Sequence, residues 1–518
     1  MDVGYMTRFA NSNFNLLNPQ KAALKFESGE TWSYKELNEK ANMYGNKLRE
    51  LGIKKGDRVG VLLHNCLEYF ALYFGIAKIG AIAVRLNFRL KSQEFDYLFN
   101  DSNIKVLCFH SNLTKQIDPI RKNTSIKHYI SFPYEGVPIP EWADPFDILE
   151  SGSKEEIVTD NISGSDPVML MYTSGTTGHP KGAVWTHDST LWFAAMQSMK
   201  WGIDGKEIAM TTGPLYHVGA MEDLALPVLL RGGTVIITKS KGFSIERILH
   251  VIEQEGVTDI FLFPFMIYDM LQSPSLNNFK LTKLNRIFTG GDPLVPWAIE
   301  QLNNKFPNIG LVQVYGLTEG TPVAASLDPE DTLLKSHTVG KPLPLTEIKL
   351  INDDEKECEV NEVGEILIKS PVVSKEYWNK IEETQKTFKD GWCRTGDLGK
   401  MDEDGYLTIA GRKKDMIRSG GENIYAAEIE DVIIRNEKVK DVAIIGIPHP
   451  KYLETVCAVV VKKDESLTEE ELINYCDSRL ANYKKPKKVI FTNELPRTPS
   501  GKVQKFILRD KYKSERVG

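Results

Sequence analysis

Apolar positions in the N-terminal part of the chain follow two alternating patterns. Short, continuously apolar runs, which predict strands, occur at 59–63, 81–86, 105–109, 168–171, 234–238, 259–263, 286–289 and 311–315. Segments with the spacing of an amphipathic helix lie between some of these runs, at 66–78 and 244–255. Short apolar strands that alternate with helices are typical of parallel sheets covered on both faces. The pattern therefore predicts an α/β fold of stacked sheets.

One predicted helix has a defined start and end. Ser33 and Glu36 have the spacing of a capping box, in which each side chain satisfies a backbone amide of the other residue. The apolar side chains that follow recur on one helical face up to Leu48, and Gly52 then ends the pattern. We expect an amphipathic helix that packs on the core with this face.

The pattern changes after Gly411, where the polar segment GRKKD at 411–415 interrupts the chain. Apolar runs at 442–447 and 456–461 then predict two strands, and residues 468–480 predict a helix. This is the content of a small α+β domain. We expect one large domain over residues 1–412 and a small one over residues 413–518.

Composition narrows the class of protein. The 518 residues include 64 Lys and Arg against 70 Asp and Glu, a net charge of -6, and this balance argues against a nucleic-acid partner. The six cysteines form no C-x-x-C pair, which disfavours a disulfide framework or a zinc site. The start of the chain does not resemble a signal peptide, and the apolar stretch at 259–271 is too short to cross a bilayer. A cytoplasmic protein that acts on a small molecule is expected.

The segment YTSGTTGHPK at 172–181 directly follows a predicted strand and has the composition of a phosphate-binding loop. Glycines let the backbone bring its N–H groups close to an anion, hydroxyl groups add donors, and a lysine adds positive charge. The residues that supply these groups are Thr173, Ser174, Gly175, Thr176, Thr177, Gly178 and Lys181. The G-x-x-x-x-G-K-[ST] spacing is missing, so a P-loop kinase or GTPase is disfavoured.

With this loop and five further blocks in order, the chain resembles the adenylate-forming superfamily of acyl-CoA synthetases, luciferases and peptide-synthetase adenylation domains. The blocks are YHVGA at 216–220, YGLTEG at 315–320, WCRTGD at 392–397, GRKKDMIRSGGENIY at 411–425 and PRTPSGK at 496–502. RLNFRL, EYWN and GGENIYAAEIE are most similar to bacterial fatty-acyl-CoA synthetases. The resemblance implies a large adenylate-forming domain with ATP and acyl pockets, and a small mobile C-terminal domain.

The resemblance also implies the reaction and its catalytic residues. A carboxylic acid reacts with ATP in the presence of Mg²⁺ to give an acyl-adenylate, and the acyl group then passes to coenzyme A. Lys502 is expected to contact the attacking carboxylate and the α-phosphate. Glu319 is the expected Mg²⁺-associated carboxylate, Thr318 lies beside the phosphates, and His217 lies between the nucleotide and acyl pockets.

Further residues are implied to bind the nucleotide. Tyr315, followed by Gly316, is expected to stack on adenine, while Asp397 accepts hydrogen bonds from the ribose hydroxyls with support from Arg412. Gly291, Asp292 and Pro293 are expected along the adenine and acyl pocket. Asp292 stands where many relatives carry Ala or Glu, which puts the contact of its side chain in doubt.

For the second half-reaction, the resemblance implies that the C-terminal domain rotates about Lys414. Gly420 and Gly421 then approach the pantetheine arm of coenzyme A, and Lys485 approaches its phosphates. The expected partners are therefore an acid, ATP and coenzyme A, and a homodimer stays open.

The acid stays open at this point. Apolar residues at 221–230 and 261–270 favour a medium- or long-chain fatty acid, but a cinnamate- or benzoate-type aryl acid fits the same composition. An amino-acid adenylation domain usually has an aromatic-Asp-x-Ser segment, whereas this chain has YHVGAMED at 216–223. A luciferase-like oxygenase would share every motif. A non-catalytic nucleotide-binding protein is disfavoured, since the residues expected to act on ATP are all present.

Overall fold

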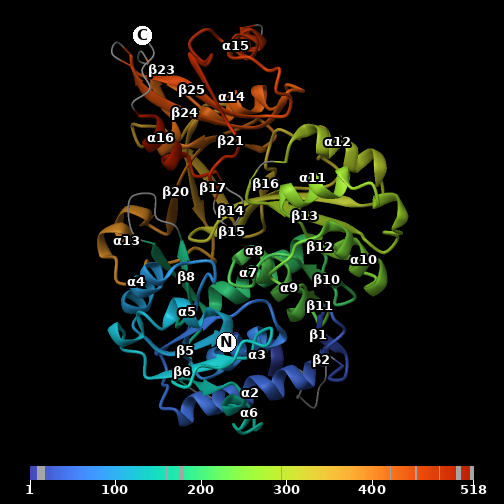
Figure 1. Cartoon of the computed structure of the whole chain (residues 1–518), viewed down its shortest axis with the longest axis vertical. Helices are drawn as coiled ribbons and strands as arrows, with labels where there is room; N and C mark the ends of the chain where they lie inside the picture. The colour runs from blue at the N-terminus through green and yellow to red at the C-terminus, as the bar shows by residue number, and fades with distance from the viewer. Residues whose placement is uncertain are drawn as a thin grey trace.

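The computed structural model describes most of the chain and divides it into two domains of unequal size (Figure 1). The described residues are 1–8, 18–158, 161–173, 180–292, 294–419, 422–449, 452–477, 479–497 and 503–513. Within these ranges the strands form four sheets. We number the sheets from first to fourth in the order in which their main strands occur along the chain.

The first sheet has the strand order β7-β6-β5-β3-β4-β8-β9. Its strands are β3 (Arg58–Leu62), β4 (Ile82–Arg85), β5 (Ile104–His110), β6 (His128–Phe132), β7 (Asp144–Pro145), β8 (Pro167–Thr173) and β9 (Lys181–Thr186). All neighbours are parallel except β8 and β9, which form an antiparallel edge.

The second sheet has the order β16-β15-β14-β13-β12-β10-β11-β1-β2 and is parallel from β14 to β1. Its strands are β1 (Ala22–Phe26), β2 (Thr31–Ser33), β10 (Ile208–Thr211), β11 (Thr234–Ile237), β12 (Asp259–Phe261), β13 (Arg286–Gly290), β14 (Gly310–Leu317), β15 (Thr321–Leu327) and β16 (Lys341–Pro342). These two sheets confirm the predicted α/β fold.

The helices of the large domain cover these sheets. They are α1 (Tyr5–Arg8), α2 (Tyr34–Glu50), α3 (Leu67–Lys78), α4 (Ser92–Ser102), α5 (Thr114–Ile117), α6 (Asp147–Glu150), α7 (His187–Trp201), α8 (Val218–Met221), α9 (Ala225–Leu230), α10 (Ile245–Glu255), α11 (Pro264–Gln272), α12 (Pro296–Lys305) and α13 (Ile381–Thr387). In α3 every residue except Glu68 is buried, because this helix is apolar on almost all sides.

The predicted start of α2 is confirmed by its hydrogen bonds. The Glu36 amide donates to Ser33 Oγ at 3.2 Å, and the Ser33 amide donates to Glu36 Oε2 at 2.7 Å. The strand predicted at 259–263 is shorter than expected, since β12 ends at Phe261. The reason is that Phe263 caps α11 and Pro264 occupies its first turn, where the missing N–H of proline is tolerated.

A third, antiparallel sheet joins the large domain to the C-terminal part of the chain. It contains β17 (Glu347–Ile351), β18 (Gly364–Lys369), β19 (Phe388–Lys389), β20 (Trp392–Met401) and β21 (Leu407–Arg412). The fourth sheet contains β22 (Ile417–Ser419), β23 (Glu422–Ile424), β24 (Val439–His449), β25 (Leu453–Lys462) and β26 (Lys488–Thr492). The chain thus passes from one sheet to the other between Arg412 and Ile417.

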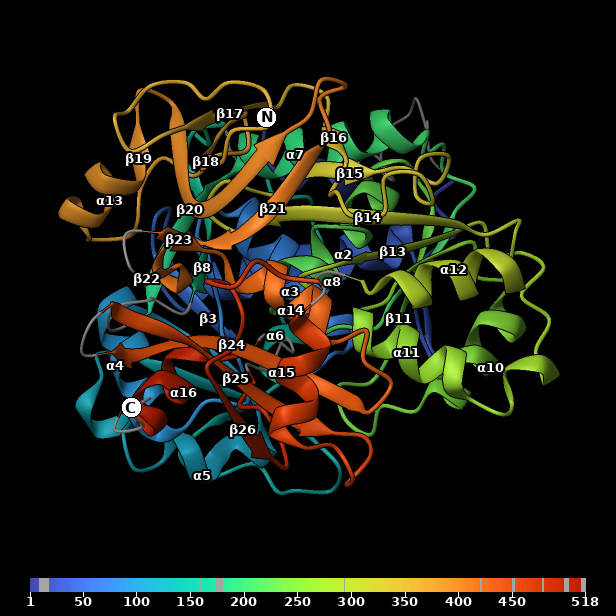
Figure 2. The ribbon, with the colours of Figure 1, turned by 90° about the horizontal axis from the view of Figure 1, so that it is seen from above.

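The C-terminal domain consists of the fourth sheet with α14 (Ala426–Ile433), α15 (Glu469–Asp477) and α16 (Lys505–Tyr512). This domain lies at one end of the long axis in Figure 1, and Figure 2, which looks down on that end, shows it covering part of the large domain. The expected smaller α+β domain is therefore confirmed. In the part of the chain that the structure describes, no helix combines the length and apolar character needed to span a membrane.

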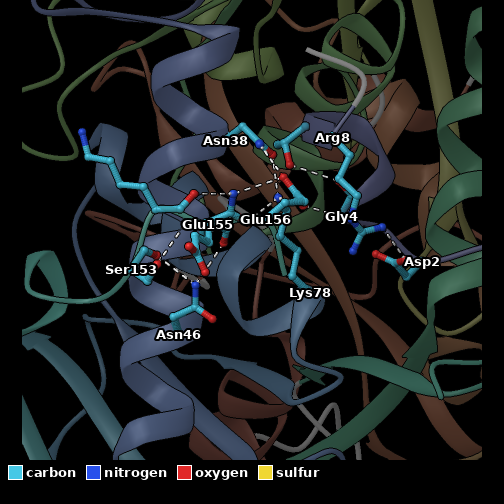
Figure 3. Close-up of polar contacts among 12 residues, drawn as sticks. Asp2, Gly4, Arg8, Asn38, Asn46, Lys78, Ser153, Glu155 and Glu156 are labelled. Atoms are coloured by element: carbon cyan, nitrogen blue, oxygen red, sulfur yellow. Dashed lines mark hydrogen bonds and ion pairs between the residues drawn. The ribbon is translucent and has the colours of Figure 1, made fainter. Parts of the chain in front are cut away.

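A buried lysine of α3 is bonded to α2 and, through Glu156, to α1 in the N-terminal segment (Figure 3). Lys78, at the end of α3, is fully buried and donates hydrogen bonds to Asn38 at 2.5 Å and to Asn42 and Glu156 at 2.8 Å. Arg8 of α1 donates to the same oxygen of Glu156 at 3.1 Å. Burial lowers the pKa of Lys78 to about 8, although the Glu156 carboxylate favours its charged form.

This pKa predicts how the stability depends on pH. The unfolded chain protonates Lys78 with the ordinary pKa of 10.5, so between pH 8 and 10.5 it binds more protons than the folded protein. In urea titrations, the free energy of unfolding of the wild type minus that of Lys78→Met should therefore rise across this window by up to about 3 kcal/mol. The wild type compared in the same way with Lys47→Met, which removes an exposed ion pair with Glu50 but keeps Lys78, should show no such rise in the difference. Parallel pH curves for wild type and Lys78→Met would contradict the expectation.

Candidate active site

The predicted phosphate loop is a connection between two paired strands. β8 and β9 are antiparallel, and Thr173 at the end of β8 pairs with Lys181 at the start of β9. The two described ends of the loop are therefore held side by side at the edge of the first sheet. Ser174, Gly175, Thr176, Thr177 and Gly178 lie outside the described residues.

Glu319 lies against the start of this loop. Its Oε1 accepts hydrogen bonds from Thr173 Oγ1 at 2.7 Å and from the Tyr377 hydroxyl at 3.1 Å. Its backbone carbonyl accepts a further bond from the Ser374 amide at 2.9 Å. The structure therefore brings together two of the residues that the sequence singled out, one from each large sheet.

A tight turn between β14 and β15 places Glu319. A Cβ atom at Gly316 would lie 2.1 Å from the Thr321 carbonyl oxygen, so no other residue fits there without a backbone shift. Beside Glu319, the Thr318 carbonyl accepts a hydrogen bond from the buried indole of Trp185 at 3.0 Å. Gly316 thus has a packing reason in addition to its predicted place in the nucleotide site.

Tyr377 connects Glu319 with the far end of the phosphate loop. The Lys181 ammonium lies 4.3 Å from the centre of the Tyr377 ring, a cation–π distance. Burial raises the pKa of the Tyr377 hydroxyl, and the Glu319 carboxylate raises it further, so Tyr377 acts as a donor at neutral pH. In the sequence, Tyr377 stands out only as part of the EYWN match, so this contact was not predicted.

A second group surrounds Asp397, whose side chain is almost fully buried. Tyr315 donates a hydrogen bond to its Oδ2 at 2.8 Å, and Arg412 Nε forms an ion pair with its Oδ1 at 2.7 Å. The register of β20 and β21 places Asp397 directly opposite Arg412. Burial and the nearby carboxylate raise the pKa of Tyr315. The three residues predicted to bind the nucleoside therefore form one cluster.

The end of β13 forms a third part of the site. Gly291 has a left-handed backbone with φ of +93°, which glycine adopts without strain, and Asp292 follows it. Tyr268 accepts a hydrogen bond from the Val295 amide at 3.3 Å and lies close enough to Asp292 to respond to its charge. Pro293 lies outside the described residues.

Two charged residues of the C-terminal domain lie close enough to affect Tyr268 in this third part of the site. Burial is the main cause that raises the pKa of Tyr268 to about 12, and the charges of Arg497 and Asp441 also act on it. Arg497 forms an ion pair with Asp441 at 2.7 Å and an isolated antiparallel bridge with Val503. Arg497 and Val503, the described residues on either side of 498–502, thus pair with each other. Lys502 itself lies outside the described residues.

His217 begins the short helix α8 and is half-buried. Its Nδ1 accepts a hydrogen bond from the Gly219 amide at 3.1 Å, so the ring caps the helix. The centre of the ring lies 6.3 Å from that of Phe263, which follows β12. His217 thus stands near the carboxyl ends of the second sheet, where ligands of open α/β sheets bind.

A buried ion pair holds the backbone on both sides of His217. Arg85, from β4 of the first sheet, forms an ion pair with Glu222, and neither side chain has exposed surface. Arg85 also donates to the carbonyl oxygens of Leu215 and, at 3.5 Å, of His217. This pair was not predicted, although a single arginine inside the apolar run 81–86 indicates a buried charge that needs a partner.

The residues predicted to serve the second half-reaction lie in the turn that follows β21 and in the C-terminal domain beyond it. Lys414 is exposed and belongs to the short 3-10 turn Lys413–Asp415 that follows β21. The adjacent Lys413 reaches back to the third sheet and pairs with Glu365 at 3.0 Å. Lys485 forms an ion pair with Asp477 at 2.5 Å. Gly420 and Gly421 lie outside the described residues.

Comparison with known proteins gives consistent matches over the whole chain. The model of the AMP-binding enzyme family matches residues 15–378, and that of the AMP-binding enzyme C-terminal domain matches residues 428–502. The chain is 37% identical to the long-chain-fatty-acid–CoA ligase FadD13 of Mycobacterium tuberculosis over 93% of both proteins. It is 33% identical to the indoleacetate–CoA ligase of Aromatoleum aromaticum over 95% of both. The solved anthranilate CoA ligase AuaEII, in complex with anthranoyl-AMP, is similar with a TM-score of 0.89, 25% identity and coverage of 98% and 97%.

The buried Arg85–Glu222 pair leads to a stability prediction. Arg85→Met should lower the free energy of unfolding by about 3–5 kcal/mol, because it leaves the Glu222 carboxylate buried without its partner. The double variant Arg85→Met/Glu222→Leu should recover most of this loss, as urea titrations of the wild type, the single variant and the double variant would measure. Removing the exposed Arg435–Asp431 pair should change stability by less than about 1 kcal/mol. A double variant as unstable as Arg85→Met would contradict this view of the pair.

Proposed function

The chain belongs to the AMP-binding enzyme family, and we propose that it is an AMP-forming ligase that joins a fatty acid to coenzyme A through an acyl-adenylate. The family match confirms the resemblance seen in the motifs. The main observation behind the proposal is that β14 connects two groups of site residues, one around Asp397 and one around Glu319. Tyr315 on this strand contacts Asp397, and Glu319 just beyond the strand contacts Thr173 at the phosphate loop. A nucleoside and its phosphates can therefore bind along one strand end.

In the first half-reaction, a carboxylate oxygen of the acid attacks the α-phosphorus of ATP and pyrophosphate leaves. Both reactants are anions, so fixed positive charge must lower their repulsion. In this proposal Lys181, beside the Tyr377 ring, supports the phosphates, and the loop residues 174–178 donate hydrogen bonds to them. Asp397 accepts hydrogen bonds from the ribose hydroxyls, while Tyr315, Gly291, Asp292 and Pro293 surround the base and the acyl end.

The residues near the phosphate loop suit Mg²⁺ bound together with ATP. Glu319 supplies one carboxylate with hydroxyl groups beside it, and oxygen ligands are what Mg²⁺ prefers. Over the described ranges, no group of three or more Asp, Glu, His or Cys residues could hold an ion by itself. Glu319 would therefore share the ion with the phosphates. The ion would neutralise charge on the phosphate oxygens.

The second half-reaction needs other groups at the same place. The thiol sulfur of coenzyme A attacks the acyl carbon and AMP leaves. We place the domain boundary at residue 412 and the hinge at Lys414, which is exposed in a short turn between the third and fourth sheets. In this scheme Lys502 serves adenylate formation. Rotation then removes it and brings Gly420 and Gly421 to the pantetheine arm and Lys485 to the phosphates of coenzyme A.

The acid is a medium- or long-chain fatty acid in this proposal. Buried apolar residues of α8, α9 and α11 near His217 support an apolar acyl pocket, and FadD13 is named for long-chain fatty acids. An aryl acid is the second candidate, because the chain is also similar to an indoleacetate–CoA ligase. A cytoplasmic location belongs to the proposal, since all six cysteines are free. A homodimer stays a prediction.

A panel of acids from acetate to palmitate, with benzoate and cinnamate, tests the proposal. With ATP, Mg²⁺ and coenzyme A, fatty acids should release equal amounts of pyrophosphate and thioester. The value of kcat/KM should rise about fourfold for each added methylene until the pocket is filled, because each buried methylene contributes about 0.8 kcal/mol. Reactions without acid serve as the control. Turnover of aryl acids alone would contradict the fatty-acid proposal, and no pyrophosphate with any acid would contradict ligase activity.

A further inference from the structure

Asp101, near the end of α4, is a carboxylate on which side chains from distant parts of the chain converge. Its Oδ2 accepts a hydrogen bond from the Tyr172 hydroxyl at 2.7 Å, and the Tyr97 hydroxyl lies 3.3 Å from its Oδ1. The Lys380 ammonium forms an ion pair with the same Oδ1 at 2.9 Å. Only 8% of the Asp101 side chain is exposed, so water screens these contacts little.

The contact with Tyr172 fixes the strand that leads into the phosphate loop. Tyr172 precedes Thr173 on β8 and pairs across the two strands with Gly182 of β9. A Cβ atom at Gly182 would lie 3.2 Å from Cζ of Tyr172, so the ring packs directly on the glycine. Burial and the Asp101 carboxylate both raise the pKa of Tyr172, which therefore stays protonated and donates. Asp101 thus holds β8 one residue before Thr173.

The contact with Tyr97 reaches the other end of the loop. Tyr97 lies one turn before Asp101 on α4. Its hydroxyl is 3.1 Å from the Pro180 carbonyl oxygen, which shares the single proton with the Asp101 carboxylate. Pro180 directly precedes Lys181, the first residue of β9. α4 therefore contacts the chain next to both Thr173 and Lys181.

The contact with Lys380 holds the segment that contains Tyr377. This segment lies along the outer edge of β9, where the Trp378 amide donates to a backbone carbonyl of that strand at 2.8 Å. Two residues further on, Lys380 forms its ion pair with Asp101. The ion pair thus fixes the segment from which Tyr377 reaches Glu319.

We propose that Asp101 is a positioning residue for adenylate formation, which places Thr173, Lys181 and Tyr377 where they serve the phosphates of ATP. It acts through these residues and makes no contact with the reacting atoms. A carboxylate suits this place because donors converge on both of its oxygens, whereas an asparagine would turn its NH₂ group toward one of them. The inference rests on the proposed ligase activity and adds a residue to the same site.

The two half-reactions depend on these positions to different extents. Adenylate formation holds the three phosphates of ATP and releases pyrophosphate. Thioester formation starts from the acyl-adenylate, which carries a single phosphate. Loss of Asp101 should therefore slow the first half-reaction much more than the second. A residue that only stabilises the fold would affect both half-reactions alike.

The test measures both half-reactions in the full-length Asp101→Asn variant with octanoate as the acid. Exchange of labelled pyrophosphate into ATP should fall about 10- to 100-fold in kcat/KM for ATP, because charge-assisted bonds are lost and the phosphate-binding groups are displaced. Thioester formation from supplied octanoyl-adenylate and coenzyme A should keep the wild-type rate. Asp96→Asn is the matched control on α4, since Asp96 contacts Asn100 of the same helix, and it should behave as the wild type in both assays.

A second variant tests the same link and gives a result even if Asp101→Asn does not fold. Tyr172→Phe removes one hydroxyl and keeps the ring, so it should lower pyrophosphate exchange and spare thioester formation. The double variant Asp101→Asn/Tyr172→Phe should lose no more exchange activity than Asp101→Asn alone, because the hydroxyl acts through that carboxylate.

The failures of the two proposals can be told apart. Wild-type exchange in Asp101→Asn, or an equal loss of both half-reactions in Asp101→Asn and Tyr172→Phe, would overturn the positioning role and leave the ligase activity in place. A wild type that shows no exchange with any acid would overturn the proposed function and this inference together.

Discussion

The contact of Glu319 with Thr173 and Tyr377 is the interaction on which the arrangement of the site depends. Thr173 ends a strand of the first sheet, Glu319 follows a strand of the second, and Tyr377 precedes the helix that leads into the third. Three parts of the chain that fold into separate sheets therefore meet at one carboxylate. A phosphate loop at the edge of the first sheet becomes part of a nucleotide site only because this contact joins it to the end of β14.

A second constraint acts on the acyl side. Arg85 crosses from the first sheet to hold the backbone around His217, and its charge is neutralised by Glu222. The next residue, Asp223, is buried without such a partner in the described part of the chain. The short segment after His217 thus contains two buried carboxyl groups in different environments. The physical difference between them is the presence of a cation within hydrogen-bonding distance.

Much of the fold could be predicted from local patterns. The capping box at Ser33, the apolar strands and the smaller C-terminal domain are confirmed, since each depends on neighbouring residues or on a simple period. The motifs also identified Asp397, Arg412 and Tyr315, which the structure places in one cluster. Tyr377 was not predicted, because its contact with Glu319 joins residues 58 positions apart through the packing of separate sheets. The roles of Lys502, Gly420 and Gly421, which lie outside the described residues, stay predictions.

The central claim is that an acyl-adenylate forms before coenzyme A reacts, and isotope exchange between pyrophosphate and ATP tests it most directly. We expect exchange that requires the acid and Mg²⁺ but proceeds without coenzyme A. In Lys502→Ala this exchange should be lost, while thioester formation from supplied acyl-adenylate and coenzyme A should persist. Exchange that appears only when coenzyme A is present, or a Lys502→Ala variant that loses both half-reactions equally, would contradict the two-step account.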